Sequence, residues 1–432
     1  MKKVLIITYY WPPSGGAGVQ RWLKFAKYLR DFGWEPVIYT PQNPGYPVLD
    51  QTLAHDIPLG IEVIKTPIWE PYGFYKRITG GKNSTNISSG LLKGKKSSGF
   101  IDDLAVWIRG NFFIPDARRF WINPSVKFLK RYLNANSIDA IVSTGPPHSM
   151  HLIALNVKKS INIQWLADFR DPWTDIDHYK ELKISYLADR IHKKMELTVL
   201  NSCDALVVVS NAMKVNFQKI TQSPIHLITN GYDPDDLDNN PVEIDQKFSI
   251  SHIGTMPPNR NPEILWVALA ELSDLIPNFR DALEIKLVGQ VDHSVFAQLK
   301  QRNLLNHTVH LEYIPHNQVS SLMRRSAVLL LAINNSPNAK GILTGKFFEY
   351  LAAGRPILAI GPTTGDLAAI LNETGAGEIA NYDDLIRIKA IITDMYKQYC
   401  EKKLVISSSG IEKYQRKNLT SELAAILNKL TS

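Results

Sequence analysis

Three polar side chains, Thr344, Lys346 and Glu349, lie at the start of one predicted helix. An apolar run at 327–333, typical of a buried strand, and a polar loop precede this helix, and Thr344 is the predicted N-cap. A helix start offers unpaired N–H groups and a positive dipole end, and Lys346 adds a full charge, so phosphate could bind here. Glu349 shares the face of Lys346, where a carboxylate can accept hydrogen bonds from two ribose hydroxyls. Alternatively, Glu349 only favours the helix dipole and Lys346 is solvated.

The segment 346–360, KFFEYLAAGRPILAI, resembles the donor-binding helix of the retaining glycosyltransferases of family four. The resemblance implies an α/β protein with the GT-B fold, in which two Rossmann-like, doubly wound domains face each other across a cleft. In that family the segment usually carries a Glu, seven residues and a second Glu, and the second Glu holds the donor ribose. Glu349 matches the second Glu, whereas the first falls on Gly341, so the chain departs from the pattern. Thr344 and Lys346 are the candidates to take up part of the missing role.

Length and charge limit the classes of protein that fit. The chain has 432 residues, enough for two ordinary domains, and its 49 basic and 41 acidic residues give a net charge of +8. Such a balance indicates an anionic partner, which could be a nucleotide diphosphate, a phospholipid surface or nucleic acid. Cys203 and Cys400 have no C-x-x-C spacing, which argues against a disulfide framework or a zinc site and favours the cytoplasm. No segment is long enough to span a bilayer.

The resemblance implies an N-terminal acceptor-binding domain at 1–234 and a C-terminal nucleotide-sugar-binding domain at 235–432, whose last helix crosses back to the first domain. A Gly-, Ser- and Lys-rich stretch at about 76–99 is predicted to be a mobile basic loop. With the aromatic residues that follow, it could bring the protein onto an anionic membrane, or it could be a solvated insertion without a partner. Nucleic acid is disfavoured because the aromatic and basic residues do not interleave.

A glycine-containing loop follows the first predicted strand, 3–8, and precedes a predicted helix at 17–32. Glycines at such a position let the backbone approach a diphosphate closely, although they could also only permit a tight turn. The third glycine of G-x-G-x-x-G is missing, and the second strand, 36–40, ends without an acidic residue, which argues against a nicotinamide dehydrogenase. The resemblance implies that Gly16 faces the donor diphosphate.

A second strand, glycine loop and helix start occur at 248–262. In the family, basic residues of this loop contact the donor diphosphate, and Arg260 matches one of them. Arg260 is therefore the candidate for the β-phosphate, and a surface arginine is the alternative. The loop at 313–316, which includes Ile314, corresponds in related enzymes to the segment against the nucleotide base.

Polar side chains also follow two predicted strands of the first domain, 138–143 and 164–167. His148 comes after the first strand, and Asp168, Arg170 and Asp171 come after the second. Open α/β sheets bind ligands at this edge, so these groups could orient an acceptor hydroxyl, receive its proton or hold a sugar hydroxyl. We expect His148 and Asp168 to be catalytic, and His148, Arg170 and Asp171 to bind the acceptor. Alternatively, His148 only caps a helix, and Arg170 and Asp171 form a structural ion pair.

The resemblance implies a retaining, nucleotide-sugar-dependent hexosyltransferase that acts on a saccharide or lipid-linked hydroxyl in bacterial polysaccharide or glycolipid assembly. We expect Lys346 and Arg260 to stabilise the leaving diphosphate. We expect the protein to be in the cytoplasm or at the inner face of the cytoplasmic membrane. Because no Asp-x-Asp motif follows a strand, we expect no metal, and no cofactor beyond the nucleotide sugar as co-substrate. One alternative is a nucleotide-sugar epimerase of the same fold. The other is a non-catalytic nucleotide- or carbohydrate-binding relative, which Gly341 favours.

Overall fold

The computed structural model describes residues 1–432 except 72–99, 178, 239, 313, 315 and 407. It divides into two compact units, which we call unit 1, Met1–Asn230 with Arg416–Ser432, and unit 2, Gly231–Gln415. The predicted division at 234 lies slightly further along the chain. The predicted basic loop at about 76–99 lies outside the described residues.

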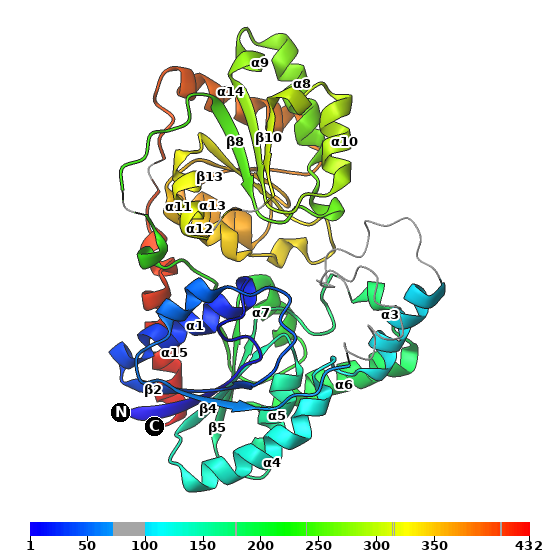
Figure 1. Ribbon diagram of the computed structural model, residues 1–432, viewed down its shortest axis with the longest axis vertical. Coiled ribbons are helices and arrows are strands. Elements are labelled where there is room, and N and C mark those ends of the chain that lie inside the picture. The colour runs from blue at the N-terminus through cyan, green and yellow to red at the C-terminus, as the bar shows by residue number, and fades with distance from the viewer. Residues whose placement is uncertain (72–99, 178, 239, 313, 315, 407) are drawn as a thin grey trace. The chain divides into compact units, whose positions relative to one another are not determined.

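Unit 1 is built on a seven-stranded parallel sheet with the strand order β3-β2-β1-β4-β5-β6-β7, and helices lie on both faces of this sheet (Figure 1). Its strands are β1 Lys2–Ile7, β2 Trp34–Pro41, β3 Glu62–Thr66, β4 Ala140–Gly145, β5 Gln164–Phe169, β6 Ala205–Val208 and β7 Ile225–Leu227. Its helices are α1 Ala17–Leu29, α3 Phe100–Phe112, α4 Arg119–Ala135, α5 Ser149–Lys158, α6 Tyr186–Ser202, α7 Asn211–Gln218 and α15 Arg416–Leu430.

Alternate side chains of β1 pack into two separate apolar cores of unit 1. Leu5 and Ile7 pack into the core that α4 and α5 cover, whereas Val4 and Ile6 pack with α1 and α15 on the other face. Strands buried on both faces read as continuous apolar runs, which is how the sequence predicted them. The helix predicted at 17–32 is instead α1 followed by a 3₁₀ turn, Arg30–Phe32, which ends at Gly33 in the left-handed conformation.

Unit 2 is built on a six-stranded parallel sheet with the strand order β10-β9-β8-β11-β12-β13. Its strands are β8 Phe248–Ile253, β9 Leu283–Val288, β10 Thr308–Leu311, β11 Val328–Ala332, β12 Ile357–Ile360 and β13 Gly377–Ala380. Its helices are α8 Glu263–Leu275, α9 Phe279–Ala282, α10 His293–Gln301, α11 His316–Arg325, α12 Gly345–Ala353, α13 Asp366–Thr374 and α14 Leu385–Cys400.

Both sheets reverse their strand order at one place, between β1 and β4 in unit 1 and between β8 and β11 in unit 2. This is the Rossmann-type doubly wound order, in which ligands bind beyond the carboxyl ends of the strands beside the reversal. The predicted α/β class with two Rossmann-like units is therefore confirmed. None of the helices in the described part of the chain combines the length and apolar character that a membrane span requires.

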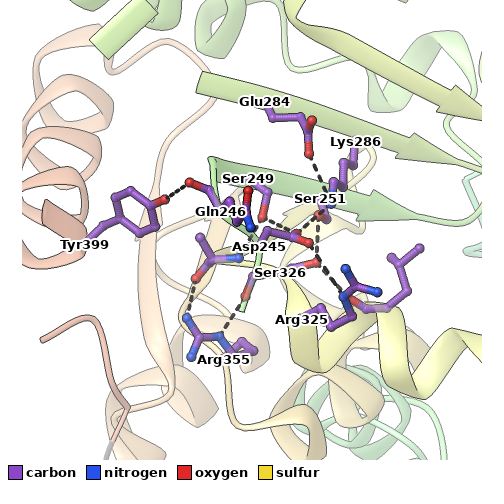
Figure 2. A network of polar contacts seen from close by, with 12 residues as sticks. Asp245, Gln246, Ser249, Ser251, Glu284, Lys286, Arg325, Ser326, Arg355 and Tyr399 are labelled. Carbon is purple, nitrogen blue, oxygen red and sulfur yellow. Dashed lines mark hydrogen bonds and ion pairs between the residues drawn. The ribbon is translucent and has the colours of Figure 1, made fainter. Parts of the chain in front are cut away.

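A polar network stabilises the sheet of unit 2 at the amino ends of its strands, where β8 and β9 begin (Figure 2). The Asp245 carboxylate accepts a hydrogen bond of 2.7 Å from Ser249 Oγ and lies 2.7 Å from Lys286 Nζ. Ser249 Oγ in turn accepts from Ala327 N at 2.8 Å. Arg355 donates from Nε to the Ser326 carbonyl at 2.7 Å, so the turn before β11 is held from both sides. The network fixes the chain that enters β8 against β9 and β11.

Replacement of Asp245 by alanine should destabilise unit 2 by about 2–3 kcal/mol, because Lys286 and Ser249 both lose a buried partner. Urea unfolding followed by circular dichroism measures this loss. The matched control is Glu401→Ala, which removes an exposed ion pair with Lys403 and should change stability by less than about 0.5 kcal/mol. Equal losses in the two variants would contradict this account.

Candidate functional site

The site in unit 2 begins with a close approach between Lys346, in the first turn of α12, and Gly254, which follows β8. Gly254 has φ +126°, and a Cβ atom at this residue would lie 1.8 Å from Lys346 Nζ and 2.1 Å from its Cε. The lysine side chain therefore reaches across the end of β8 through space that only a glycine leaves open. This brings the ammonium to the place where the strand order of unit 2 reverses.

Arg260 fixes the loop after β8 to the loop after β11. Its Nε donates to Asn334 Oδ1 at 2.8 Å, and its Nη1 donates to the Thr255 carbonyl at 3.1 Å. Asn335 N also donates to the Asn259 carbonyl at 3.1 Å. A guanidinium held in this way is oriented before a ligand arrives.

The electrostatics of Lys346 follow from its surroundings. Burial lowers its pKa below the ordinary value; the negative charge of Glu349 acts in the opposite direction, and the positive charge of Arg260 adds to the lowering. Two cations thus share one partly buried region that contains a single carboxylate from α12. A bound phosphate would stabilise both cations.

The start of α12 carries polar groups without a protein partner. Thr344 has the extended backbone of an N-cap, as predicted, but its side chain makes no capping hydrogen bond. Its Oγ1 is buried and has no hydrogen-bond partner among the described residues. Phe347 N donates to the Thr344 carbonyl at 3.1 Å, so the hydroxyl and the N–H groups of Gly345 and Lys346 are the groups that can bind an external acceptor such as a phosphate oxygen.

Glu349 is half-buried one turn further along α12, and Gly341 is half-buried in the 3₁₀ turn Ala339–Gly341 that precedes the helix. Position 341, where the related pattern has its first Glu, thus supplies no carboxylate. Ile314 is half-buried and packs against the apolar core beneath α12. Both neighbours of Ile314 lie outside the described residues.

His252 belongs to the same region, and the sequence reasoning missed it. It lies on β8 two residues before Gly254, and its Nδ1 faces the Leu330 carbonyl at 3.1 Å. Burial and the charges of Lys346 and Arg260 lower its pKa to about 3, so the imidazole is neutral. In the tautomer that donates from Nδ1 to the Leu330 carbonyl, Nε2 is a buried nitrogen without a hydrogen-bond partner in the described part of the chain.

In unit 1, Arg170 connects the start of α1 with the end of β4 and the loop after it, at the carboxyl edge of the sheet. Its Nη1 donates to the Gly18 carbonyl at 2.8 Å, its Nη2 donates to the Pro146 carbonyl, and its backbone N donates to the Gly145 carbonyl at 2.9 Å. Its Nε is buried and has no hydrogen-bond partner among the residues that the structure describes. Arg170 therefore both shapes this edge and leaves one donor for a ligand.

His148, Asp171 and Gly16 lie on loops of the same edge. His148 is buried and stacks on Trp173, with ring centroids 4.7 Å apart and an interplanar angle of 5°. It stands at the N-cap of α5 without a capping side-chain hydrogen bond, and Asp116 binds Ser149 N at 2.9 Å instead. Asp171 is exposed. Gly16 is exposed at the N-cap of α1 with φ +84°, a conformation that favours glycine.

Asp168 lies beneath this edge and is fully buried. Its Oδ1 accepts from Arg21 Nε at 3.1 Å and from Nη2 at 3.0 Å, and its Oδ2 accepts from Trp22 Nε1 at 2.7 Å and Thr144 Oγ1 at 2.8 Å. Burial opposes ionisation, but the charge of Arg21 and these hydrogen bonds outweigh it and hold the pKa of Asp168 below its ordinary value of 3.8. A carboxylate with both oxygens occupied is suited to positioning α1, and the sequence reasoning did not identify Arg21 or Trp22 as its partners.

Replacement of Asp168 by asparagine should destabilise unit 1 by about 3–5 kcal/mol at pH 7, because Arg21 is left as an uncompensated buried charge. The folded-state pKa of Asp168 is lowered, so its contribution is complete above the unfolded pKa and is lost as pH falls through the folded pKa. The difference between wild type and variant should therefore shrink below about pH 4. Urea unfolding at pH 7 and pH 3 tests this, with Asp31→Asn as a control, since it removes only an exposed ion pair with Lys417 and should change stability by less than about 0.5 kcal/mol.

Comparisons with known proteins bear on the family and the fold of this chain. The family model described as Glycosyltransferase Family 4 matches residues 94–236. No match was found among curated proteins.

Several solved structures share the fold over nearly the whole chain. Sucrose-phosphate synthase from Thermosynechococcus elongatus is 14% identical, with 100% of this chain and 99% of that chain covered and a TM-score of 0.63. HepE from Anabaena in complex with UDP-glucose is 13% identical, with 99% and 100% covered and a TM-score of 0.64. WaaG, a glycosyltransferase involved in lipopolysaccharide biosynthesis, is 14% identical, with 99% and 98% covered and a TM-score of 0.55. The chain therefore has the GT-B fold of glycosyltransferases, and its residues 94–236 match Glycosyltransferase Family 4, as the sequence predicted.

Proposed function

We propose that this protein is a retaining glycosyltransferase that moves a hexosyl unit from a nucleotide diphosphate sugar to a hydroxyl acceptor. Unit 2 binds the donor and unit 1 binds the acceptor. The observation that carries the proposal is the position of the Lys346 ammonium over Gly254, beside Arg260 and the start of α12. The complex of HepE with UDP-glucose supports a nucleotide-sugar donor for a chain of this fold.

The chemistry follows from where charge develops. As the glycosidic bond breaks, negative charge grows on the departing diphosphate. Lys346, Arg260 and the unpaired N–H groups after Thr344 are fixed before the reaction, so they stabilise this charge without reorganisation. Because the charge is larger in the transition state than in the bound donor, these groups contribute mainly to turnover.

The remaining donor contacts come from α12 and nearby loops. Glu349 accepts hydrogen bonds from the two ribose hydroxyls, and Thr344 Oγ1 donates to a phosphate oxygen. Ile314 lies against the base. With cations and N–H groups in these roles, the proposed reaction needs neither a metal ion nor a further cofactor.

The acceptor side uses the edge of unit 1. Arg170 offers its buried Nε, and Asp171 and His148 lie on the adjoining loops, so all three can orient an acceptor hydroxyl. Asp168 acts through Arg21 and α1, as a positioning residue beneath this surface. We propose a saccharide or lipid-linked acceptor in bacterial cell-surface polysaccharide or glycolipid assembly, at the inner face of the cytoplasmic membrane.

Lys346→Ala and Arg260→Ala should each lower kcat by about a hundredfold, because each removes one charge that stabilises the leaving diphosphate. Steady-state kinetics with a saturating UDP- or GDP-sugar measures this effect. The matched control is Lys340→Ala, an exposed lysine on the loop before α12, which should keep nearly full turnover. Near-normal kcat in both the Lys346 and Arg260 variants would refute the proposed mechanism.

Glu349→Ala should weaken binding of a nucleoside diphosphate by about tenfold to a hundredfold, because two hydrogen bonds to a carboxylate are lost. Calorimetric titration with UDP and with GDP measures the loss and identifies the preferred base. Glu263→Ala, an exposed glutamate in the first turn of α8, serves as the control and should leave affinity unchanged. Unchanged affinity in the Glu349 variant would remove its assigned role.

Product analysis separates the proposed transferase from its two alternatives. A nucleotide-sugar epimerase would convert the donor without any acceptor. A non-catalytic relative, which Gly341 favours, would bind the donor without hydrolysis or transfer across a range of acceptors. A transferase should instead form a glycosidic product that depends on the acceptor and retains the anomeric configuration.

A further inference from the structure

Helix α3 of unit 1 exposes large apolar side chains. Leu104, Trp107, Ile108 and Phe112 are 44%, 39%, 37% and 59% exposed, respectively. Spacings of three and four residues place them on one face of the helix. This face therefore has no partner within the described part of the chain, although burial of such side chains is strongly favourable.

Helix α6 exposes a second face that combines apolar and basic side chains. Leu187 and Ile191 are 68% and 37% exposed, and Arg190 and Lys194 are exposed beside them at positions that fall on the same face. Tyr186 is 78% exposed at the start of the helix, and its ring lies 5.8 Å from the Arg190 guanidinium carbon. Long basic side chains next to leucine and isoleucine are typical of a helix that lies in a membrane interface.

The acidic side chains of α6 do not cancel this positive charge. Asp189 pairs with Lys193, with an Oδ2–Nζ distance of 2.7 Å, and Glu196 is buried beneath the helix. Arg190 and Lys194 thus leave the exposed face of α6 with a net positive charge. An anionic surface is the complementary partner.

Unit 1 holds the two helices next to each other (Figure 1). Asn111 Nδ2 donates to the Lys183 carbonyl at 3.1 Å, and Asn111 Oδ1 accepts from Ser185 N at 2.7 Å, so the end of α3 is fixed to the start of α6. Gly110 allows this approach, because a Cβ atom there would lie 2.4 Å from the Leu182 carbonyl oxygen. The two exposed faces therefore lie on adjoining helices of unit 1, and we call them together the α3–α6 surface.

We propose that this α3–α6 surface binds the interfacial region of an anionic lipid bilayer. The apolar side chains of α3 enter the boundary between headgroups and acyl chains, and Arg190 and Lys194 contact lipid phosphates. This inference rests on the membrane location in the proposed function and assigns the contact with the membrane to the α3–α6 surface. It can be tested without a donor or an acceptor, so its failure is distinguishable from failure of the transferase assignment.

Vesicle co-sedimentation of the full-length protein tests the charge requirement. The protein should bind vesicles of equal parts phosphatidylglycerol and phosphatidylcholine, and should bind phosphatidylcholine vesicles much more weakly. The double variant Arg190→Glu, Lys194→Glu should lose about tenfold or more of this affinity. The double variant Lys300→Glu, Lys397→Glu reverses two exposed charges of unit 2 and should bind like wild type.

The apolar requirement is tested independently with Trp107→Ser, Phe112→Ser, which should also lose about tenfold or more. Its control is Ile386→Ser, Val405→Ser, which removes two apolar side chains of unit 2 that are 83% and 73% exposed. Thermal unfolding confirms that each variant is folded, and the two pairs do not depend on each other.

Wild-type binding that neither the charge pair nor the apolar pair reduces would overturn the proposal and assign binding to another segment, such as the basic stretch at 76–99. Absence of wild-type binding would also overturn it. So would light scattering that shows a dimer which the Trp107, Phe112 variant dissolves, because the surface would then serve a second copy.

Discussion

The unit 2 site depends on one steric constraint, the absence of a side chain at Gly254. The Lys346 ammonium occupies the space where a Cβ atom of residue 254 would stand. Gly289 lies close to the backbone of Gly254, since a Cβ atom at residue 289 would lie 3.0 Å from the Gly254 carbonyl carbon. Two glycines at the ends of adjacent strands thus let a cation from α12 reach the end of β8. The buried neutral imidazole of His252 lies on the same strand, so the cations have an uncharged neighbour below them.

The buried charges of unit 1, unlike those of the unit 2 site, are compensated by other side chains of the protein. The Asp168 carboxylate compensates the buried Arg21 and receives hydrogen bonds from Trp22 and Thr144, so these charges hold architecture together. The guanidinium of Arg170, which follows β5, has a similar function, because it connects the start of α1 to the loop after β4. Burial works against the charged form of Arg170 and lowers its pKa, while Asp168 and Asp171 act to raise it. The carboxyl edge of the unit 1 sheet is thus built on compensated charges, whereas that of the unit 2 sheet has an excess of positive charge.

Much of the fold could be predicted from the sequence, because strand, loop and helix follow from local patterns. The strand at 327–333 and the helix after Thr344 were predicted from an apolar run and a cap residue, and β11 and α12 confirm them. The partners of side chains could not be predicted in this way. Asp168 was expected on an open edge, but Arg21 and Trp22 reach it from a helix far away in the chain. His252 was missed because a single histidine in an apolar strand carries no motif. Its place in the site becomes clear only from its neighbours Lys346 and Arg260, whose charges help to lower its pKa.

Helix α15 has a consequence for how the chain acquires its structure. Its Leu419, Leu423 and Leu427 complete the core of unit 1 that α1 begins, although all of unit 2 is synthesised between the two helices. During translation, the apolar face of α1 must therefore wait, partly uncovered, until the intervening unit has emerged. Domains generally fold from the N-terminus as they leave the ribosome, and exposed apolar surface attracts chaperones or aggregates. In this chain unit 2 can therefore fold first, and the core of unit 1 is completed last, when α15 has been synthesised.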